Sequence, residues 1–130
     1  ELESSLKQPI VLIKNNELPQ VSENDSVVKV IVEISEKRLG VTAVIKNDKI
    51  IGIITDGDLR RMLSKTTEIN NFTAKDIMGN NPKTINENAM AIEALDALEN
   101  NSITQILVTD DTNRYAGVVH LHDLIKEGIF

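Results

Sequence analysis

Two stretches of the chain carry the hydrophobic stripe of an amphipathic helix. In each stretch apolar residues recur at positions i, i+3, i+4 and i+7, a spacing that places them on one helix face. The stripes are Val27, Val30, Ile31 and Ile34, and, 64 positions later, Ala91, Ala94, Leu95 and Leu98. The pattern predicts two helices that each cover a hydrophobic core.

The same order of elements follows each predicted helix. An apolar run predicts a buried strand, a polar turn comes next, and a second apolar run predicts a second strand. These segments are residues 41–45, 46–49 and 50–54 in the first half and 105–108, 110–114 and 115–119 in the second. Asp58-Leu59 and Asp123-Leu124 then each open a second short helix. Five elements repeated in one order predict an internal duplication.

The duplication divides the chain into two repeats of mixed α/β (α+β) class. We place the first repeat at residues 11–68 and the second at residues 69–130, with residues 1–10 as the tail of a linker. The connection, residues 65–81, is polar and contains a helical turn at 74–78. A repeat of about 60 residues buries too little apolar surface by itself, so we expect the two repeats to pack face to face.

Composition narrows the classes of partner. A net charge of −6 and a pI near 4.9 disfavour nucleic acid and anionic membranes, both of which require clustered Lys and Arg. No apolar run approaches the length of a membrane span, and no signal peptide is evident. The lack of cysteine fits a cytoplasmic protein. The chain begins at Glu1 rather than at Met, which suggests a fragment of a longer protein.

The turn from the second predicted strand into the following helix carries the most chemistry. Thr55 lies at or near the N-cap and Asp58 in the first helical turn. One interpretation is a capping box without further function. In the other, Gly57 lets a ligand approach the backbone, Asp58 accepts ribose hydroxyls, and Thr55 addresses a phosphate. Arg61 or its neighbour Arg60 then supplies positive charge, and both interpretations remain open.

The second repeat has two histidines at the matching turn. His120 and His122 beside Asp123 raise the possibility of a metal site, but no further ligand is evident, and we favour polar lining of a pocket for His120. Either histidine makes a site sensitive to pH between about 5 and 8. Asp56 and Asp58 do not come with the other groups of a phosphoryl-transfer site, and no Ser/His/Asp arrangement is evident. We therefore expect neither catalysis nor a cofactor nor a metal in this chain.

Two repeats that each end in apolar-Gly-apolar-apolar before an Asp-Leu pair resemble the CBS domain family, whose paired form is the Bateman module. The resemblance implies β-α-β-β-α repeats packed with pseudo-twofold symmetry, and nucleotides bound in clefts between them. The family's hydroxyl-x-x-Asp signature falls on Thr55 and Asp58, whereas His120 replaces the hydroxyl in the second repeat. The ligand-binding residues so implied are Gly40, Val41, Thr42, Ala43, Thr55, Asp56, Gly57, Asp58, Arg61, Thr104, Gln105, Ile106, His120, His122 and Asp123.

A narrower resemblance is carried by residues 53–61, Ile-Ile-Thr-Asp-Gly-Asp-Leu-Arg-Arg, and by residues 117–124, Gly-Val-Val-His-Leu-His-Asp-Leu. Together they resemble the C-terminal half of bacterial D-arabinose 5-phosphate isomerases. This implies an N-terminal sugar-isomerase domain before Glu1 as the partner, and an enzyme that supplies arabinose 5-phosphate for synthesis of the lipopolysaccharide sugar Kdo. The implied effector is CMP-Kdo, or else CMP, AMP or ATP.

The sequence thus predicts a regulatory, effector-sensing and homo-oligomeric module. Two alternatives stay open. In the first, the pair acts purely as a structural oligomerisation module that binds no ligand. In the second, it is an enzyme in its own right, such as a metal-dependent phosphatase.

Overall fold

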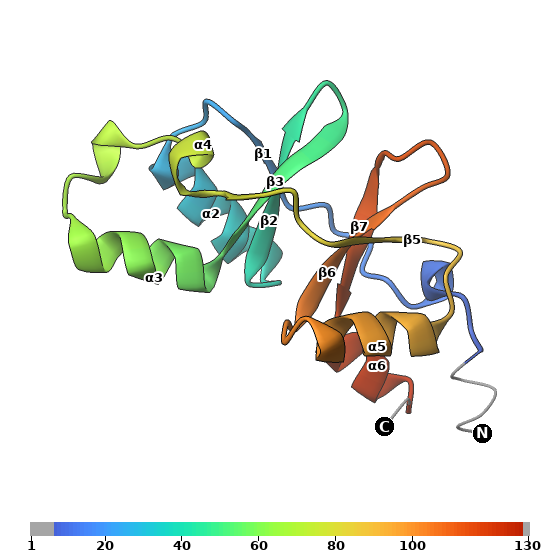
Figure 1. The fold of residues 1–130 in the computed structure, drawn as a ribbon. Helices are drawn as coiled ribbons and strands as arrows, with labels where there is room; N and C mark the ends of the chain where they lie inside the picture. The colour runs from blue at the N-terminus through green and yellow to red at the C-terminus, as the bar shows by residue number, and fades with distance from the viewer. Residues whose placement is uncertain (1–6, 129–130) are drawn as a thin grey trace. The chain divides into compact units, whose positions relative to one another are not determined.

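The chain divides into two compact units (Figure 1). A computed structural model describes residues 7–128. The first unit is residues 18–82, and the second unit is residues 83–130 together with residues 1–17. The boundaries of these units differ from those of the sequence repeats, because the N-terminal segment packs with elements of the second repeat. Of the expected linker tail, residues 1–6 lie outside the described part.

The first unit combines a four-stranded sheet with helices. Its strands are β1 (Gln20–Ser22), β2 (Val41–Lys46), β3 (Lys49–Thr55) and β4 (Gly79–Asn80), in the order β1-β2-β3-β4. β1 runs parallel to β2, and the other two pairings are antiparallel. The helices are α2 (Val27–Lys37), α3 (Asp56–Lys65) and α4 (Ala74–Ile77), with a 3₁₀ turn, η2 (Ile69–Asn71), before α4.

The apolar stripe of α2 forms the core of the first unit. Val27 and Val30 are fully buried and Ile34 nearly so. They cluster with residues of β2, β3 and α3, namely Val44, Ile54, Leu59 and Met62. The Ser26 hydroxyl accepts a hydrogen bond from the Lys29 N–H and so caps the helix at the point where the stripe begins. The pattern of apolar positions therefore fixes which face of α2 is buried.

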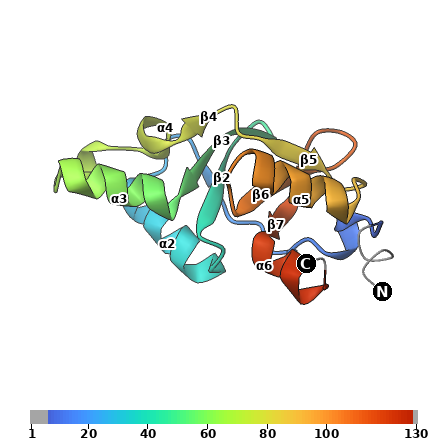
Figure 2. The same cartoon turned by 60° about the horizontal axis from the view of Figure 1, so that its bottom comes forward.

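The second unit repeats this plan with a three-stranded sheet. Its strands are β5 (Thr84–Asn86), β6 (Gln105–Thr109) and β7 (Tyr115–His120), with β5 parallel to β6 and β6 antiparallel to β7. Its helices are α5 (Ala91–Asn100) and α6 (Leu121–Lys126), which lie side by side in both views (Figures 1 and 2), and the 3₁₀ turn η1 (Ile10–Leu12). The predicted α/β class and both series of strand, helix, strand, strand and helix are confirmed.

A short segment from the neighbouring repeat completes each unit. In the first unit, residues 73–80 cross beside α2, where the Ala74 N–H donates to the Asp25 carbonyl (2.8 Å), and end as β4 against β3. In the second unit, residues 9–15 make the equivalent contacts: the Ile10 N–H donates to the Ala89 carbonyl (2.8 Å) and the Asn15 N–H to the Val118 carbonyl (2.8 Å). Since Ile10 and Ala74 are 64 positions apart, residues 9–15 belong to the duplication, which the apolar pattern did not predict.

These crossing segments account for the glycines that correspond between the repeats. A Cβ on Gly52 would meet the Met78 side chain and lie 3.0 Å from the Gly79 carbonyl oxygen. A Cβ on Gly117 would lie 2.8 Å from the Asn15 carbonyl oxygen, and the φ of Gly117 is +152°. Each glycine therefore lets a crossing segment approach the second strand of its unit.

Within residues 7–128, no helix has the length and hydropathy required to cross a membrane.

Candidate functional site

Thr55 and Asp58 form a reciprocal capping box at the start of α3. The Thr55 hydroxyl accepts a hydrogen bond from the Asp58 N–H (3.2 Å), and Asp58 Oδ2 accepts from the Thr55 N–H (2.9 Å). The hydroxyl also donates to the same Oδ2 (3.1 Å). The capping interpretation is therefore confirmed as a structural fact, and whether a ligand binds there as well depends on what surrounds the cap.

Arg61 adds a cation to this turn. Its guanidinium forms an ion pair with Asp58 Oδ1. A Cβ on Gly57 would lie 3.4 Å from Arg61 Nη1 and 3.5 Å from the Thr55 hydroxyl, so the guanidinium and the hydroxyl flank this glycine. Asp56, at the first helical position, is exposed. Thr55, Gly57, Asp58 and Arg61 thus converge on one place, as the sequence predicts.

The start of β2 lies at the same end of the sheet. Val41 pairs with Thr55 in the ladder, and the Asp56 N–H donates to the Gly40 carbonyl (3.1 Å). Thr42 and Ala43 are buried, and the Thr42 hydroxyl donates to the Ala43 carbonyl (3.1 Å). The side chains of Thr42 and Ala43 are therefore packed inside the protein, and Gly40 and Val41 are the residues of this group that adjoin the cap.

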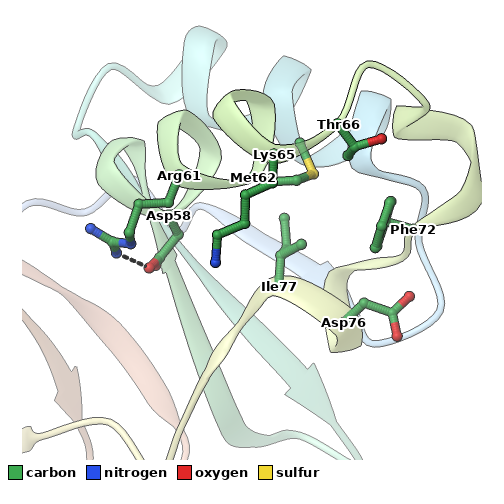
Figure 3. A pocket seen from close by; sticks show the side chains of 8 residues that line it. All are labelled: Asp58, Arg61, Met62, Lys65, Thr66, Phe72, Asp76 and Ile77. Carbon is green, nitrogen blue, oxygen red and sulfur yellow. Dashed lines mark hydrogen bonds and ion pairs between the residues drawn. The ribbon is translucent and has the colours of Figure 1, made fainter.

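A pocket of about 370 Å³ opens beside the cap, between α3 and α4 (Figure 3). It is lined by Asp58, Arg61, Met62, Lys65, Thr66, Phe72, Asp76 and Ile77. In Figure 3 the Lys65 side chain extends from α3 into the space between Asp58 and Ile77. The pocket therefore has an apolar surface, from a methionine, a phenylalanine and an isoleucine, beside two cations and two carboxylates.

Sequence reasoning reached Asp58 and Arg61 but missed the six other lining residues. Two signals were present. Asp58, Met62 and Lys65 fall on one face of α3 by helical spacing. Thr73-Ala-Lys-Asp76 repeats the Thr-x-x-Asp pattern, and Asp76 Oδ2 accepts from the Thr73 N–H (2.8 Å) as Asp58 does from Thr55. The pocket thus lies between two capped helix starts.

The second unit places its predicted residues in the matching arrangement. Gln105 pairs with His120, and the Leu121 N–H donates to the Thr104 carbonyl (2.7 Å). His120 Nδ1 accepts from the His122 N–H (3.0 Å), and Asp123 Oδ2 accepts from the His120 N–H (2.9 Å). The imidazole therefore acts as the helix cap in place of the threonine hydroxyl. Ile106 is buried in the core.

The apolar surface of the pocket is only partly repeated in the second unit, where Ile13 corresponds to Ile77 by the offset of 64. At the positions that correspond to Met62 and Phe72 stand Glu127 and Gln8. Lys126 corresponds to Arg61. The two ends of the duplication are therefore chemically different, and the first unit is the better equipped for a ligand with an apolar part. No group of three or more His, Asp or Glu residues able to hold a metal occurs between residues 7 and 128.

Comparison with known families agrees with this duplicated geometry. The model of the CBS domain matches twice, at residues 12–65 and 74–129. The chain belongs to the CBS domain family. The match covers most of the sequence, and the chain is a pair of CBS domains.

The chain is also similar to individual known proteins and solved structures. Arabinose 5-phosphate isomerase KdsD of Francisella tularensis is 41% identical over 121 residues, which cover 93% of this chain and 37% of that protein. The chain thus spans well under half of the relative and matches its CBS region. An uncharacterized conserved protein from Pyrococcus horikoshii superposes with a TM-score of 0.83 at 26% identity, covering 95% of this chain and 93% of that one.

A third structure shares the fold. The CBS domain pair of protein MJ0100, solved with 5′-methylthioadenosine and S-adenosylmethionine, superposes with a TM-score of 0.81 at 21% identity and covers 92% of this chain and 94% of that one.

Proposed function

We propose that this CBS pair senses a small anionic effector of the nucleotide or nucleotide-sugar class, and that the effector binds in the pocket between α3 and α4. The observation that carries the proposal is the composition of this pocket. Its apolar residues, Met62, Phe72 and Ile77, suit the flat face of a base, while Arg61 and Lys65 suit an acidic group.

The size of the pocket supports the same class. Ligand pockets commonly measure about 300–1,000 Å³, and this one, at about 370 Å³, accommodates a nucleotide-sized molecule or part of one. Thr55, Gly40 and Gly57 lie at the start of α3, next to the pocket residues Asp58 and Arg61, where the helix dipole favours negative charge.

The resemblance to arabinose 5-phosphate isomerases supports CMP-Kdo as the first candidate effector. In this proposal the whole protein is a cytoplasmic, oligomeric isomerase that converts ribulose 5-phosphate to arabinose 5-phosphate, and the CBS pair regulates it. A ligand that prefers one arrangement of the two CBS domains shifts the activity of an attached domain through a coupling of about 1–3 kcal/mol.

Calorimetric titration of the isolated chain tests this proposal. The panel is CMP-Kdo, CMP, AMP and ATP, with 5′-methylthioadenosine and S-adenosylmethionine as adenosyl comparators. We expect saturable binding of at least one phosphorylated member. Absence of binding across the panel would overturn the sensing function.

An assembly role is the second candidate, and the exposed surface of α2 favours it. Val28 and Val32, one turn apart, are 46% and 47% exposed, and the residue that corresponds to Val32 in the second unit is Asp96. We propose a second copy of the chain as the occupant. Val32→Asp is expected to lower the molar mass measured by light scattering, with Thr67→Asp, at an exposed position outside α2, as control. An unchanged mass would contradict the assembly role.

A further inference from the structure

The carboxylate of Asp58 has both oxygens engaged before any ligand arrives. Oδ2 accepts from the Thr55 N–H (2.9 Å) and from the Thr55 hydroxyl (3.1 Å). Oδ1 accepts from the Arg61 guanidinium. A sugar that donates its hydroxyls to Asp58 therefore has to compete with Arg61 for Oδ1, because the Oδ2 contacts hold the start of α3.

The contact with Arg61 is the one that a ligand can displace. The Arg61 side chain is 68% exposed and that of Asp58 is 21% exposed. An ion pair in such an exposed position is weak, because water solvates both partners well once they separate. The contacts between Thr55 and Asp58 are local, three residues apart and partly buried, so they persist while the guanidinium moves.

The balance of charge in the pocket determines what can move the guanidinium. Asp76 is engaged in its own cap, since its Oδ2 accepts from the Thr73 N–H (2.8 Å) and hydroxyl (3.2 Å). Lys65 has no carboxylate partner within residues 7–128. An anionic group that enters therefore finds Lys65 available and Arg61 held only by Asp58, whereas a neutral ligand offers Arg61 nothing in exchange.

We propose that Arg61 selects ligands of this pocket by charge: an acidic group on the ligand takes the guanidinium, and Asp58 Oδ1 is thereby released to accept hydroxyls from the same ligand. The inference rests on the proposed effector site and adds the residue that sets its specificity. A neutral nucleoside has to break the ion pair without replacing it, so Arg61 acts against neutral ligands and in favour of acidic ones.

The test compares two matched pairs of ligands, CMP with cytidine and AMP with adenosine, which differ only in the phosphate. Calorimetry on the wild-type chain is expected to give at least about 10-fold tighter binding of the nucleotide. In Arg61→Ala the nucleotide is expected to lose about 10-fold in affinity while the nucleoside keeps or gains affinity, so that the ratio falls toward one. Arg61→Lys keeps the charge and is expected to keep part of the ratio.

Arg60→Ala is the matched control, because Arg60 is exposed on the same helix and does not line the pocket. It removes the same net charge, and we expect it to leave the ratio unchanged. Circular dichroism checks that each variant is folded. Two outcomes would contradict selection by Arg61 while leaving the proposed effector site intact. In one, nucleotide and nucleoside both bind and lose affinity equally in Arg61→Ala. In the other, Arg60→Ala changes the affinity ratio as much as Arg61→Ala does.

Two outcomes concern the site itself. If neither the wild-type chain nor Arg61→Ala binds any of the four ligands, the inference fails, and the effector site fails with it only when CMP-Kdo and ATP also do not bind. If the wild-type chain binds no nucleoside and Arg61→Ala does, the guanidinium is identified as the group that excludes neutral ligands.

Discussion

At the residue scale, Thr55 lies next to the pocket residue Asp58, and its one hydroxyl serves both as helix cap and as candidate ligand contact. It accepts from the Asp58 N–H (3.2 Å) and donates to Asp58 Oδ2 (3.1 Å). Its only hydrogen is therefore engaged in the ligand-free chain, and contact with a phosphate requires the hydroxyl to turn away from Asp58. A ligand contact at Thr55 would therefore use the same atom that caps α3.

Replacement of Thr55 by alanine is expected to cost about 1 kcal/mol in the free energy of unfolding, the usual loss for an N-cap hydroxyl. Urea unfolding followed by circular dichroism measures it. Thr67→Ala, at an exposed position after α3, is the control and is expected to change little. Equal stability of the Thr55 variant and the wild type would show that the cap contributes nothing measurable.

Asp110 gives a second prediction at this scale. The Arg114 N–H and then the Thr112 hydroxyl donate to its carboxylate in the turn between β6 and β7, and they lower its pKa below the ordinary value of 3.8. A lowered pKa stabilises the folded state above pH 3.8, and this contribution is lost as the pH falls through the folded-state value. Carboxyl NMR titration is expected to give a midpoint under 3.8, and a midpoint above it would contradict the turn geometry.

The Thr-x-x-Asp pattern also shows how much of the site can be predicted from a sequence motif alone. From sequence, Thr55 and Asp58 predict a cap and permit a ligand, and the structure confirms the cap. Thr73 and Asp76 have the same pattern, and Asp76 Oδ2 likewise accepts from the Thr73 N–H and hydroxyl, so the pattern cannot by itself separate a cap from a ligand site. Met62, Lys65 and Phe72 make the difference around Asp58, and they come together through the packing of α3 beside α4, which the spacing of motifs does not report.

At the element scale, the helices and paired strands follow from periodicity, because burial of one face is a local property of the sequence. β4 and the segment 9–15 do not follow from periodicity. β4 is two residues long, and residues 9–15 are too short to show a periodic pattern. Burial of Ile10 and Ile13 and backbone hydrogen bonds to distant segments determine where residues 9–15 lie. The sequence shows Gly52 and Gly117 as a matching pair 65 positions apart, but it does not show the crossing segments that require a glycine there.

Gly117→Ala tests the crossing at this scale. The new Cβ would lie 2.8 Å from the Asn15 carbonyl oxygen, and the φ of +152° is strained for any residue with a side chain. We expect a loss of about 1–3 kcal/mol in the free energy of unfolding. Unfolding can be followed by the fluorescence of Tyr115, the chain's single tyrosine, which lies in β7.

Gly79→Ala is the control for this substitution, because a Cβ there meets nothing closer than 3.8 Å. Equal stability of the Gly117 and Gly79 variants would mean that residues 9–15 do not hold to β7 as described.

At the scale of the whole molecule, the two units share one series of elements but differ in the residues at their matching ends. Both units keep the strand, helix, strand, strand and helix series, and both cap the last helix with a carboxylate three residues after the N-cap. Within residues 7–128, Met62 and Phe72 line the pocket of the first unit, whereas Glu127 and Gln8 stand at the matching places of the second. This difference is the reason to assign the effector to the first unit.

The most direct test of that assignment is an amide NMR titration of the ¹⁵N-labelled chain with CMP-Kdo. We expect the largest chemical-shift changes on residues 55–66 and 72–77, which surround the pocket. Saturable changes confined to other residues, such as 120–127 at the matching end of the second unit, would contradict it, as would a spectrum that does not change.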